Sequence, residues 1–224
     1  SDWGGFGKAP KFPHAEDLRW LLSAAERLGP KQKTAHDMVL FTLRKMASGG
    51  MYDQIGGGFA RYSVDAKWLI PHFEKMLYDN ALLLAVHQRA ARCGVGPAAL
   101  HQRVIQLSLE WLQREMLDPL GGVWSTLDAD SEDAQGEKHE GEFYLWTPDE
   151  VAQILTADDA ELACRLWTIS AAGNFETSAR SVLALESEVE IDTEHELRLR
   201  QALLAAREVR VARVHHRNAR CRIP

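Results

Sequence analysis

Apolar side chains recur at helical spacing along most of the chain, which predicts a mainly helical fold. Leu18, Leu22 and Ala25 share one face of a first predicted helix, which ends at Gly29. Similar stripes predict further helices over residues of about 34–47, 71–93, 97–116, 147–155, 160–168 and 194–209. Pro71 suits the first turn of the third helix, because the N–H that proline lacks is not needed there.

Glycine pairs and short alternating segments separate these helices. Double glycines at 4–5, 49–50 and 121–122 mark turns, and residues 58–63 and 142–146 alternate like short strands. Paired helices joined by long loops favour a toroid of helical hairpins whose loops gather at one end. The predicted fold class is therefore all-α, a partial toroid of helical hairpins with short β-hairpin loops.

Composition narrows the class of protein. The 224 residues are 46% hydrophobic and 26% charged, and no linker divides them. No apolar run approaches the roughly 20 residues of a membrane helix, and a net charge of -6 argues against a nucleic-acid surface. Cys93, Cys164 and Cys221 lie far apart without zinc spacing, so we expect reduced thiols and a cytoplasmic location.

Residues 68–80 concentrate polar side chains at the start of an apolar helix. These side chains are His72, Glu74, Lys75, Tyr78 and Asp79. In a helix that begins at residue 71, His72, Lys75 and Asp79 share one face, and the other two share the neighbouring face. An acid and a base near a histidine can serve acid–base chemistry. The alternative is structural, with a Lys75–Asp79 salt bridge.

The glycine run at 56–58 gives a second candidate. It lacks the GK[ST] ending of a phosphate loop. Together with Asp53, Arg61 and Tyr62 it would form a loop that faces a carbohydrate. The alternative is a tight turn required by packing, since glycine tolerates positive φ and close approach of the backbone.

Carboxylates form the third candidate. Asp128 and Asp130 alternate along the chain, and Glu142 follows. The spacing does not meet the EF-hand pattern, and we expect neither a metal nor a cofactor. Glycoside cleavage uses paired carboxylates, one as acid and the other as base or nucleophile. The alternative is a solvated acidic loop.

Long motifs in a fixed order carry a family resemblance. They are GGFGKAPKFP at 4–13, GMYDQIGGGFARYSVD at 50–65, WLIPHFEKMLYDN at 68–80, DADSE at 128–132 and GEFYLWT at 141–147. The chain closely resembles, over residues of about 4–211, the thioredoxin-domain-containing family that includes bacterial YyaL-type proteins and a spermatogenesis-associated thioredoxin-like protein. The resemblance implies an N-terminal thioredoxin-like domain followed by an (α/α)6 toroid, similar to N-acylglucosamine 2-epimerases and six-hairpin glycosidases.

The resemblance also sets an expected domain organisation. Residues 1–211 would form a partial (α/α)6 toroid domain, about half of a ring. The thioredoxin-like domain of the family would be absent, so the chain is interpreted as a fragment. Residues 212–224, which are rich in arginine and match nothing in the family, would form an aberrant basic tail.

Two classes of function remain open. The first is a carbohydrate-active enzyme, either an epimerase-like isomerase with His72 as the base or a glycosidase-like hydrolase with a carboxylate pair. The second is a non-catalytic module that binds a protein or peptide. The predicted catalytic residues are His72, Glu74, Asp53 and Asp128. The predicted substrate-binding residues are Arg61, Tyr62, Trp68, Lys75, Tyr78, Asp79, Asp130 and Glu142. Convergence of the catalytic residues on one cavity would support this site, and their scatter across the surface would contradict it.

Overall fold

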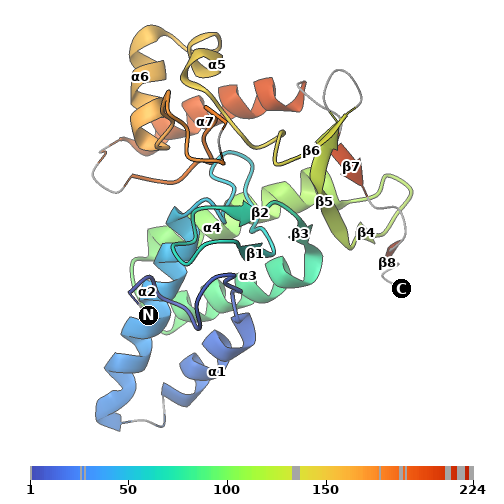
Figure 1. Ribbon diagram of the computed structural model, residues 1–224. Helices are drawn as coiled ribbons and strands as arrows, with labels where there is room; N and C mark the ends of the chain where they lie inside the picture. Colours follow the sequence, from blue (N-terminus) through green and yellow to red (C-terminus); the bar gives the residue numbers. More distant parts are fainter. Residues whose placement is uncertain are drawn as a thin grey trace.

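The structure is a computed structural model that describes residues 2–25, 27, 29–132, 137–176, 178–186, 189, 191–209, 213–215 and 220–221. Within these residues the chain is roughly half helical, with several small antiparallel sheets. Helices α1 to α4 lie together in one half of the molecule and α5 to α7 in the other, with β1, β2 and β3 between them (Figure 1).

Four helices build the N-terminal half. They are α1 (Ala15–Ala25), α2 (Gln32–Ser48), α3 (Leu77–Arg92) and α4 (Ala98–Trp111), and a short 3-10 helix (Gly29–Lys31) precedes α2. Helix α1 packs against α2 and α3, and α3 packs against α4. The apolar stripes of these helices, with Leu18, Val39 and Leu43 among them, form one buried cluster. The predicted spacing is therefore confirmed here, and a π-helical turn (Leu112–Met116) continues α4 to the predicted end.

Three helices build the C-terminal half, namely α5 (Pro148–Ala152), α6 (Ala157–Leu166) and α7 (Thr193–Glu208). Thr147 and Glu150 form a capping box at the start of α5. Trp167, Leu199 and Leu203 belong to a second buried cluster, which also contains Ile55 from the glycine-rich loop of the other half. That loop therefore ties the two halves together.

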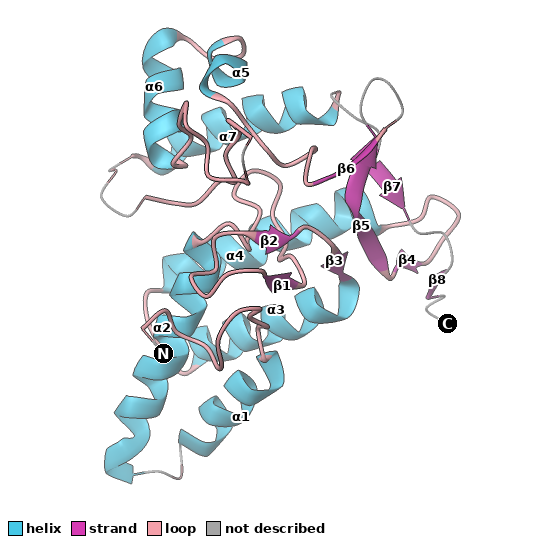
Figure 2. Cartoon of the chain, viewed as in Figure 1, coloured by secondary structure: helices cyan, strands magenta, loops and turns pink. Residues whose placement is uncertain are grey.

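Short strands lie between the two groups of helices and at one side of the molecule (Figure 2). β1 (Tyr62–Ser63) pairs with β2 (Pro71–His72). β5 (Thr126–Glu132) pairs with β3 (Lys75–Met76), β6 (Lys138–Glu140) and β7 (Arg213–His215), and β4 (Val123–Trp124) pairs with β8 (Arg220–Cys221). These sheets make an all-α description incomplete. Asp128 and Asp130 lie in strand β5, whereas the alternative to a carboxylate site was a solvated loop.

The predicted helical start at Pro71 is wrong. Residues 71–76 are extended, and α3 begins at Leu77. β2 pairs with β1, which lies close by in sequence, and β3 pairs with β5, about 50 residues away, and this pairing overrides the local preference. Proline is as acceptable at the start of a strand as in a first helical turn. The two predicted helical faces around His72 therefore do not exist.

The wider architectural predictions stay open. The helices and small sheets do not establish the (α/α)6 toroid, which remains a prediction. Most of the predicted basic tail, 212–224, lies outside the described residues, apart from the backbone of β7 and β8. No helix in the described part of the chain combines the length and apolar character needed to cross a bilayer.

Candidate functional site

The extended segment at 71–76 has two faces, because side chains alternate along a strand. Pro71, Phe73 and Lys75 are buried and line a cavity, which we call the inner face. His72 and Glu74 are only partly buried and point to the opposite side, the outer face. Side chains alternate between the two faces of this extended segment. His72 and Lys75, which a helix would place on one face, therefore lie on opposite faces.

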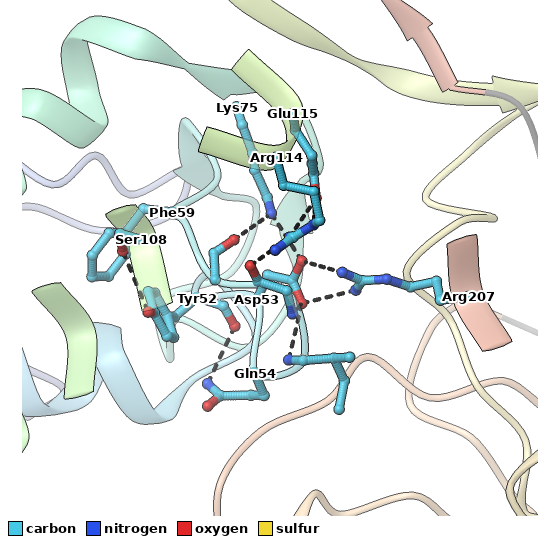
Figure 3. Close-up of polar contacts among 12 residues, drawn as sticks. Tyr52, Asp53, Gln54, Phe59, Lys75, Ser108, Arg114, Glu115 and Arg207 are labelled. Carbon is cyan, nitrogen blue, oxygen red and sulfur yellow. Dashed lines mark hydrogen bonds and ion pairs between the residues drawn. The ribbon is translucent and has the colours of Figure 1, made fainter. Parts of the chain in front are cut away.

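Asp53 is the centre of the inner face (Figure 3). Its Oδ2 lies 2.9 Å from Lys75 Nζ, and its two oxygens receive both terminal nitrogens of Arg207 at 2.9 and 3.0 Å. The backbone N–H groups of Ile55 and Gly56 donate to Oδ1 at 3.1 and 2.8 Å. We call Asp53, Lys75 and Arg207 the buried ionic cluster.

The ionic cluster is almost completely withdrawn from water, with side-chain exposures of 6% for Asp53, 2% for Lys75 and 1% for Arg207. Burial alone would raise the pKa of the Asp53 carboxyl, but the charges of Arg207 and Lys75 outweigh it and hold that pKa well below its usual range. Asp53 is therefore an ionised structural anchor, and its lone pairs are already used by protein donors.

The glycine-rich loop surrounds this carboxylate. Lys75 Nζ donates to the Gly57 carbonyl at 2.7 Å, and Arg114 donates to the Gly56 carbonyl at 2.8 Å. Gly57 has φ +80°, and a Cβ there would collide with the carbonyl of Leu107. The loop therefore requires glycine for packing, as the structural alternative predicted. Asn80 fastens it to α3 by hydrogen bonds to both the N–H and the carbonyl of Phe59.

The cavity beside the ionic cluster is small. It offers about 20 Å³ to the centre of a water molecule, enough for roughly one water. Binding sites for drug-sized ligands have volumes of about 300–1,000 Å³. A sugar ring therefore does not fit on the inner face.

Aromatic rings stack along the outer face. The Tyr62 ring lies 4.9 Å from the rings of both Phe12 and His72, with interplanar angles of 32° and 22°. His72 Nδ1 lies 2.8 Å from Glu140 Oε1, which orients the imidazole. The result is a partly exposed aromatic platform with a carboxylate-oriented histidine at one end.

Carboxylates border this platform. Arg61 donates to Glu74 at 3.0 Å, and Thr126 Oγ1 donates to the other Glu74 oxygen at 3.4 Å. In β5, Leu127 and Ala129 are buried, so the alternating Thr126, Asp128 and Asp130 lie on the outer side of the strand. Asp130 stands directly across from Glu140 in the register. The outer face thus carries most of the predicted polar residues.

Asp79 lies near this border, in the first turn of α3. Burial raises the pKa of its carboxyl to about 6, partly offset by the charge of Arg61 and by a hydrogen bond to Tyr78. Its Oδ2 atom is buried and has no hydrogen-bond partner among the described residues. Asp79 therefore holds its proton at a pH where an ordinary aspartate has lost it.

Two predicted residues lie elsewhere. Trp68 is fully buried, and its indole Nε1 donates to the Trp3 carbonyl at 2.9 Å, so it is a core residue. Glu142 forms an ion pair with Arg180, which also pairs with Glu150 at 3.2 Å. The predicted catalytic residues do not share one cavity, because Asp53 is on the inner face and His72, Glu74 and Asp128 are on the outer face.

Sequence reasoning missed Arg207, and a signal for it was present. Leu199, Leu203 and Arg207 are spaced four apart on α7, and all three are buried. An arginine that continues an apolar stripe indicates a buried partner, because an unpaired buried charge is too costly. Arg114 carried no comparable signal. Within the described residues, no group of three His, Cys, Asp or Glu side chains could hold a metal ion.

Comparison with known proteins finds relatives for most of the chain. It is 42% identical over 157 residues to spermatogenesis-associated protein 20 of Mus musculus and 40% identical over 157 residues to that of Homo sapiens. Over 156 residues it is 41% identical to an uncharacterised protein of Caenorhabditis elegans. These alignments cover 68–69% of this chain, which spans about a fifth of the length of the curated relatives it matches. No family model matches the chain. The similarity agrees with the spermatogenesis-associated part of the resemblance and does not extend to thioredoxin-like or epimerase-like domains.

Proposed function

We propose that the outer face is a carbohydrate site within a domain of the (α/α)6 toroid type. The observation that carries the proposal is the partly exposed stack of Phe12, Tyr62 and His72 beside several carboxylates. Sites for small molecules combine aromatic surface with a few placed polar groups. The aromatic platform would contact the apolar face of a sugar ring, while Arg61 and the carboxylates would bind its hydroxyl groups.

A hydrolase-like reaction would use two carboxyl groups in different protonation states. Asp79, with a pKa raised to about 6, can donate a proton near neutral pH. Glu74, which is ion-paired with Arg61 at 3.0 Å, would act as the ionised partner. Asp128, on the same outer side of β5, is an alternative ionised partner.

An epimerase-like reaction would instead use His72 as the base that removes a proton beside a carbonyl. Glu140, at 2.8 Å from Nδ1, would hold the ring so that Nε2 faces the substrate. A histidine oriented by a carboxylate in this way is a common arrangement for proton transfer.

Titration calorimetry with a panel of neutral hexoses, N-acetylhexosamines and oligosaccharides tests this proposal. We expect binding that weakens in His72→Ala and Glu74→Gln. Two surface variants serve as matched controls: His14→Ala, whose imidazole pairs with Asp17 at 3.1 Å, and Glu16→Gln, whose carboxylate pairs with Arg19 at 3.5 Å. The absence of binding by every sugar, or equal affinities in all four variants, would contradict a carbohydrate site.

A second candidate is a non-catalytic module that binds a protein or peptide. The specific observation is the exposure of large apolar side chains, 50% for Tyr78 and 43% for Phe12, at the border of the outer face. A partner that is captured by the chain and lost on Tyr78→Ala would support this candidate. Trp68→Ala is unsuitable for the experiment, because Trp68 is part of the core.

A further inference from the structure

Large apolar side chains are exposed on one side of α2. Met38, Phe41 and Lys45 are spaced three and four residues apart, so they share one face of this helix, turned away from the buried Val39. Met38 is 52% exposed and Phe41 is 40% exposed. Trp3, from the segment that precedes α1, adds an indole that is 39% exposed. In monomeric proteins, contiguous apolar surface rimmed by polar residues marks an interaction site.

Two lysines connect these side chains. Lys45 Nζ lies 5.2 Å from the centroid of the Trp3 ring and 5.7 Å from that of the Phe41 ring. Lys67 Nζ lies 5.4 Å from the centroid of the Trp3 ring. Each contact is a cation–π interaction, which requires the cation within about 6 Å of the ring centroid. We call Trp3, Met38, Phe41, Lys45 and Lys67 the α2 patch.

The N-terminal segment begins beside α2 (Figure 1), and its backbone is fixed there. The Trp3 carbonyl accepts a hydrogen bond from the buried Trp68 indole at 2.9 Å, and the Gly5 N–H donates to Thr42 Oγ1 at 2.8 Å. A Cβ at Gly4 would collide with the backbone of Thr42, so the two chain segments are in close contact. The exposed indole is therefore held by a fixed backbone, which lowers the entropy lost when a partner binds.

The two lysines of the α2 patch form no ion pair within the described part of the chain. Three carboxylates lie within two residues of the patch along the chain, namely Asp2, Asp37 and Asp65. Asp37 pairs with Lys33 at 2.6 Å. Burial lowers the pKa of Lys11 and the charge of Asp65 opposes this shift, so Asp65 is matched by Lys11. Asp2 is left against Lys45 and Lys67, which gives a surplus of positive charge on a chain whose net charge is -6.

We propose that the α2 patch binds an acidic amphipathic segment of a protein partner. Carboxylates of the partner would meet the two lysines, and its apolar side chains would pack on the aromatic rings and on Met38. Trp, Phe and Met are enriched at the centres of protein interfaces, and Trp is a frequent hot spot. A lipid surface fits less well, because apolar side chains must enter it by about 5–10 Å, whereas the indole of Trp3 lies under two lysines. The α2 patch shares no residue with the outer face, so the proposal is independent of the carbohydrate site.

Fluorescence anisotropy with labelled synthetic peptides tests this surface. The probe is a helical peptide of leucine and glutamate, about 14 residues or roughly four turns long, and the same peptide with lysine for glutamate is its control. We expect the acidic peptide to bind more tightly, and its affinity to fall as salt rises. Lys45→Glu combined with Lys67→Glu should weaken binding about tenfold or more. Lys31→Glu combined with Lys33→Glu makes the same charge change at the start of α2 and should bind like the wild type.

The apolar part of the α2 patch has its own matched pair of variants. Trp3→Ala should weaken binding of the acidic peptide about tenfold or more, because a central tryptophan is lost. Trp20→Ala removes a tryptophan that is 67% exposed on α1 and should leave the affinity unchanged. No measurable binding of the acidic peptide, equal affinity for both peptides, or equal effects of the two lysine pairs would overturn the proposal. Binding to vesicles with about 30% phosphatidylserine, without binding to the acidic peptide, would also overturn it in favour of a lipid surface.

Discussion

A pair of buried histidines should make the folded state sensitive to mild acid. His87 on α3 and His101 on α4 are fully buried, and their Nδ1 atoms lie 3.0 Å apart. His101 Nε2 lies 2.7 Å from the Val95 carbonyl, so it must carry the proton. His101 Nδ1 is then the acceptor and His87 Nδ1 the donor, which leaves His87 Nε2 unprotonated. His87 Nε2 has no partner among the described residues, so a proton added there would find no acceptor.

The magnitude follows from the shift in pKa. Burial lowers the pKa of His87 from 6.5 to about 3, with a smaller contribution from His101. The unfolded chain therefore binds a proton at His87 below pH 6.5 that the folded chain refuses, so the contribution of His87 to stability falls as pH falls from 6.5 toward 3. Asp79, whose pKa the fold raises to about 6, contributes with the opposite sign over part of this range, equally in the wild type and in a His87 variant. The linkage relation gives a loss of about 2 kcal/mol at pH 5 and a limit of about 5 kcal/mol below pH 3.

Urea unfolding at pH 7.5 and pH 5 measures this loss, with His87→Gln as the test variant. Glutamine can still donate to His101 but does not titrate, so the variant should lose about 2 kcal/mol less than the wild type between these two pH values. His14→Gln, at an exposed position, should follow the wild type. The ionic cluster does not interfere, because a depressed Asp53 pKa affects stability only below about pH 4. Equal pH dependence in wild type and His87→Gln would refute the reasoning.

Three further predictions concern the inner face and the helix cap. Lys75→Met should cost about 3–5 kcal/mol in urea unfolding, and adding Asp53→Asn should cost less than the sum of the two, because they share one buried ion pair. Gly57→Ala should cost at least about 1–3 kcal/mol from backbone strain and collision, whereas Gly94→Ala, also at positive φ but in open space, should cost less. Thr147→Ala should cost about 0.5–2 kcal/mol by removing the cap of α5, as thermal or urea unfolding would report.

The helices were predictable because their apolar stripes are local in sequence. The stripe from Leu18 to Ala25 and the Thr147 capping box specify structure through residues a few positions apart, and a helix formed at both places as predicted. The prediction of a helix over residues 71–76 failed for the opposite reason. These residues pair with β1 and β5, and β5 lies about 50 residues away. No local pattern reveals that pairing, so the division of His72 and Lys75 between two faces could not be foreseen.

The inner and outer faces depend on each other through the register of one strand. Lys75 reaches Asp53 only if side chains alternate as they do in β2 and β3, and the same alternation directs His72 and Glu74 outward. A slip of one residue would bury those two polar side chains and expose Phe73. Such a slip would also leave the Asp53 carboxylate buried beside Arg207 without its lysine. A buried ion pair adds little net stability compared with apolar packing, but it penalises every arrangement that breaks it. The Asp53–Lys75 pair therefore selects which side chains the outer face presents, even though neither residue lies on that face.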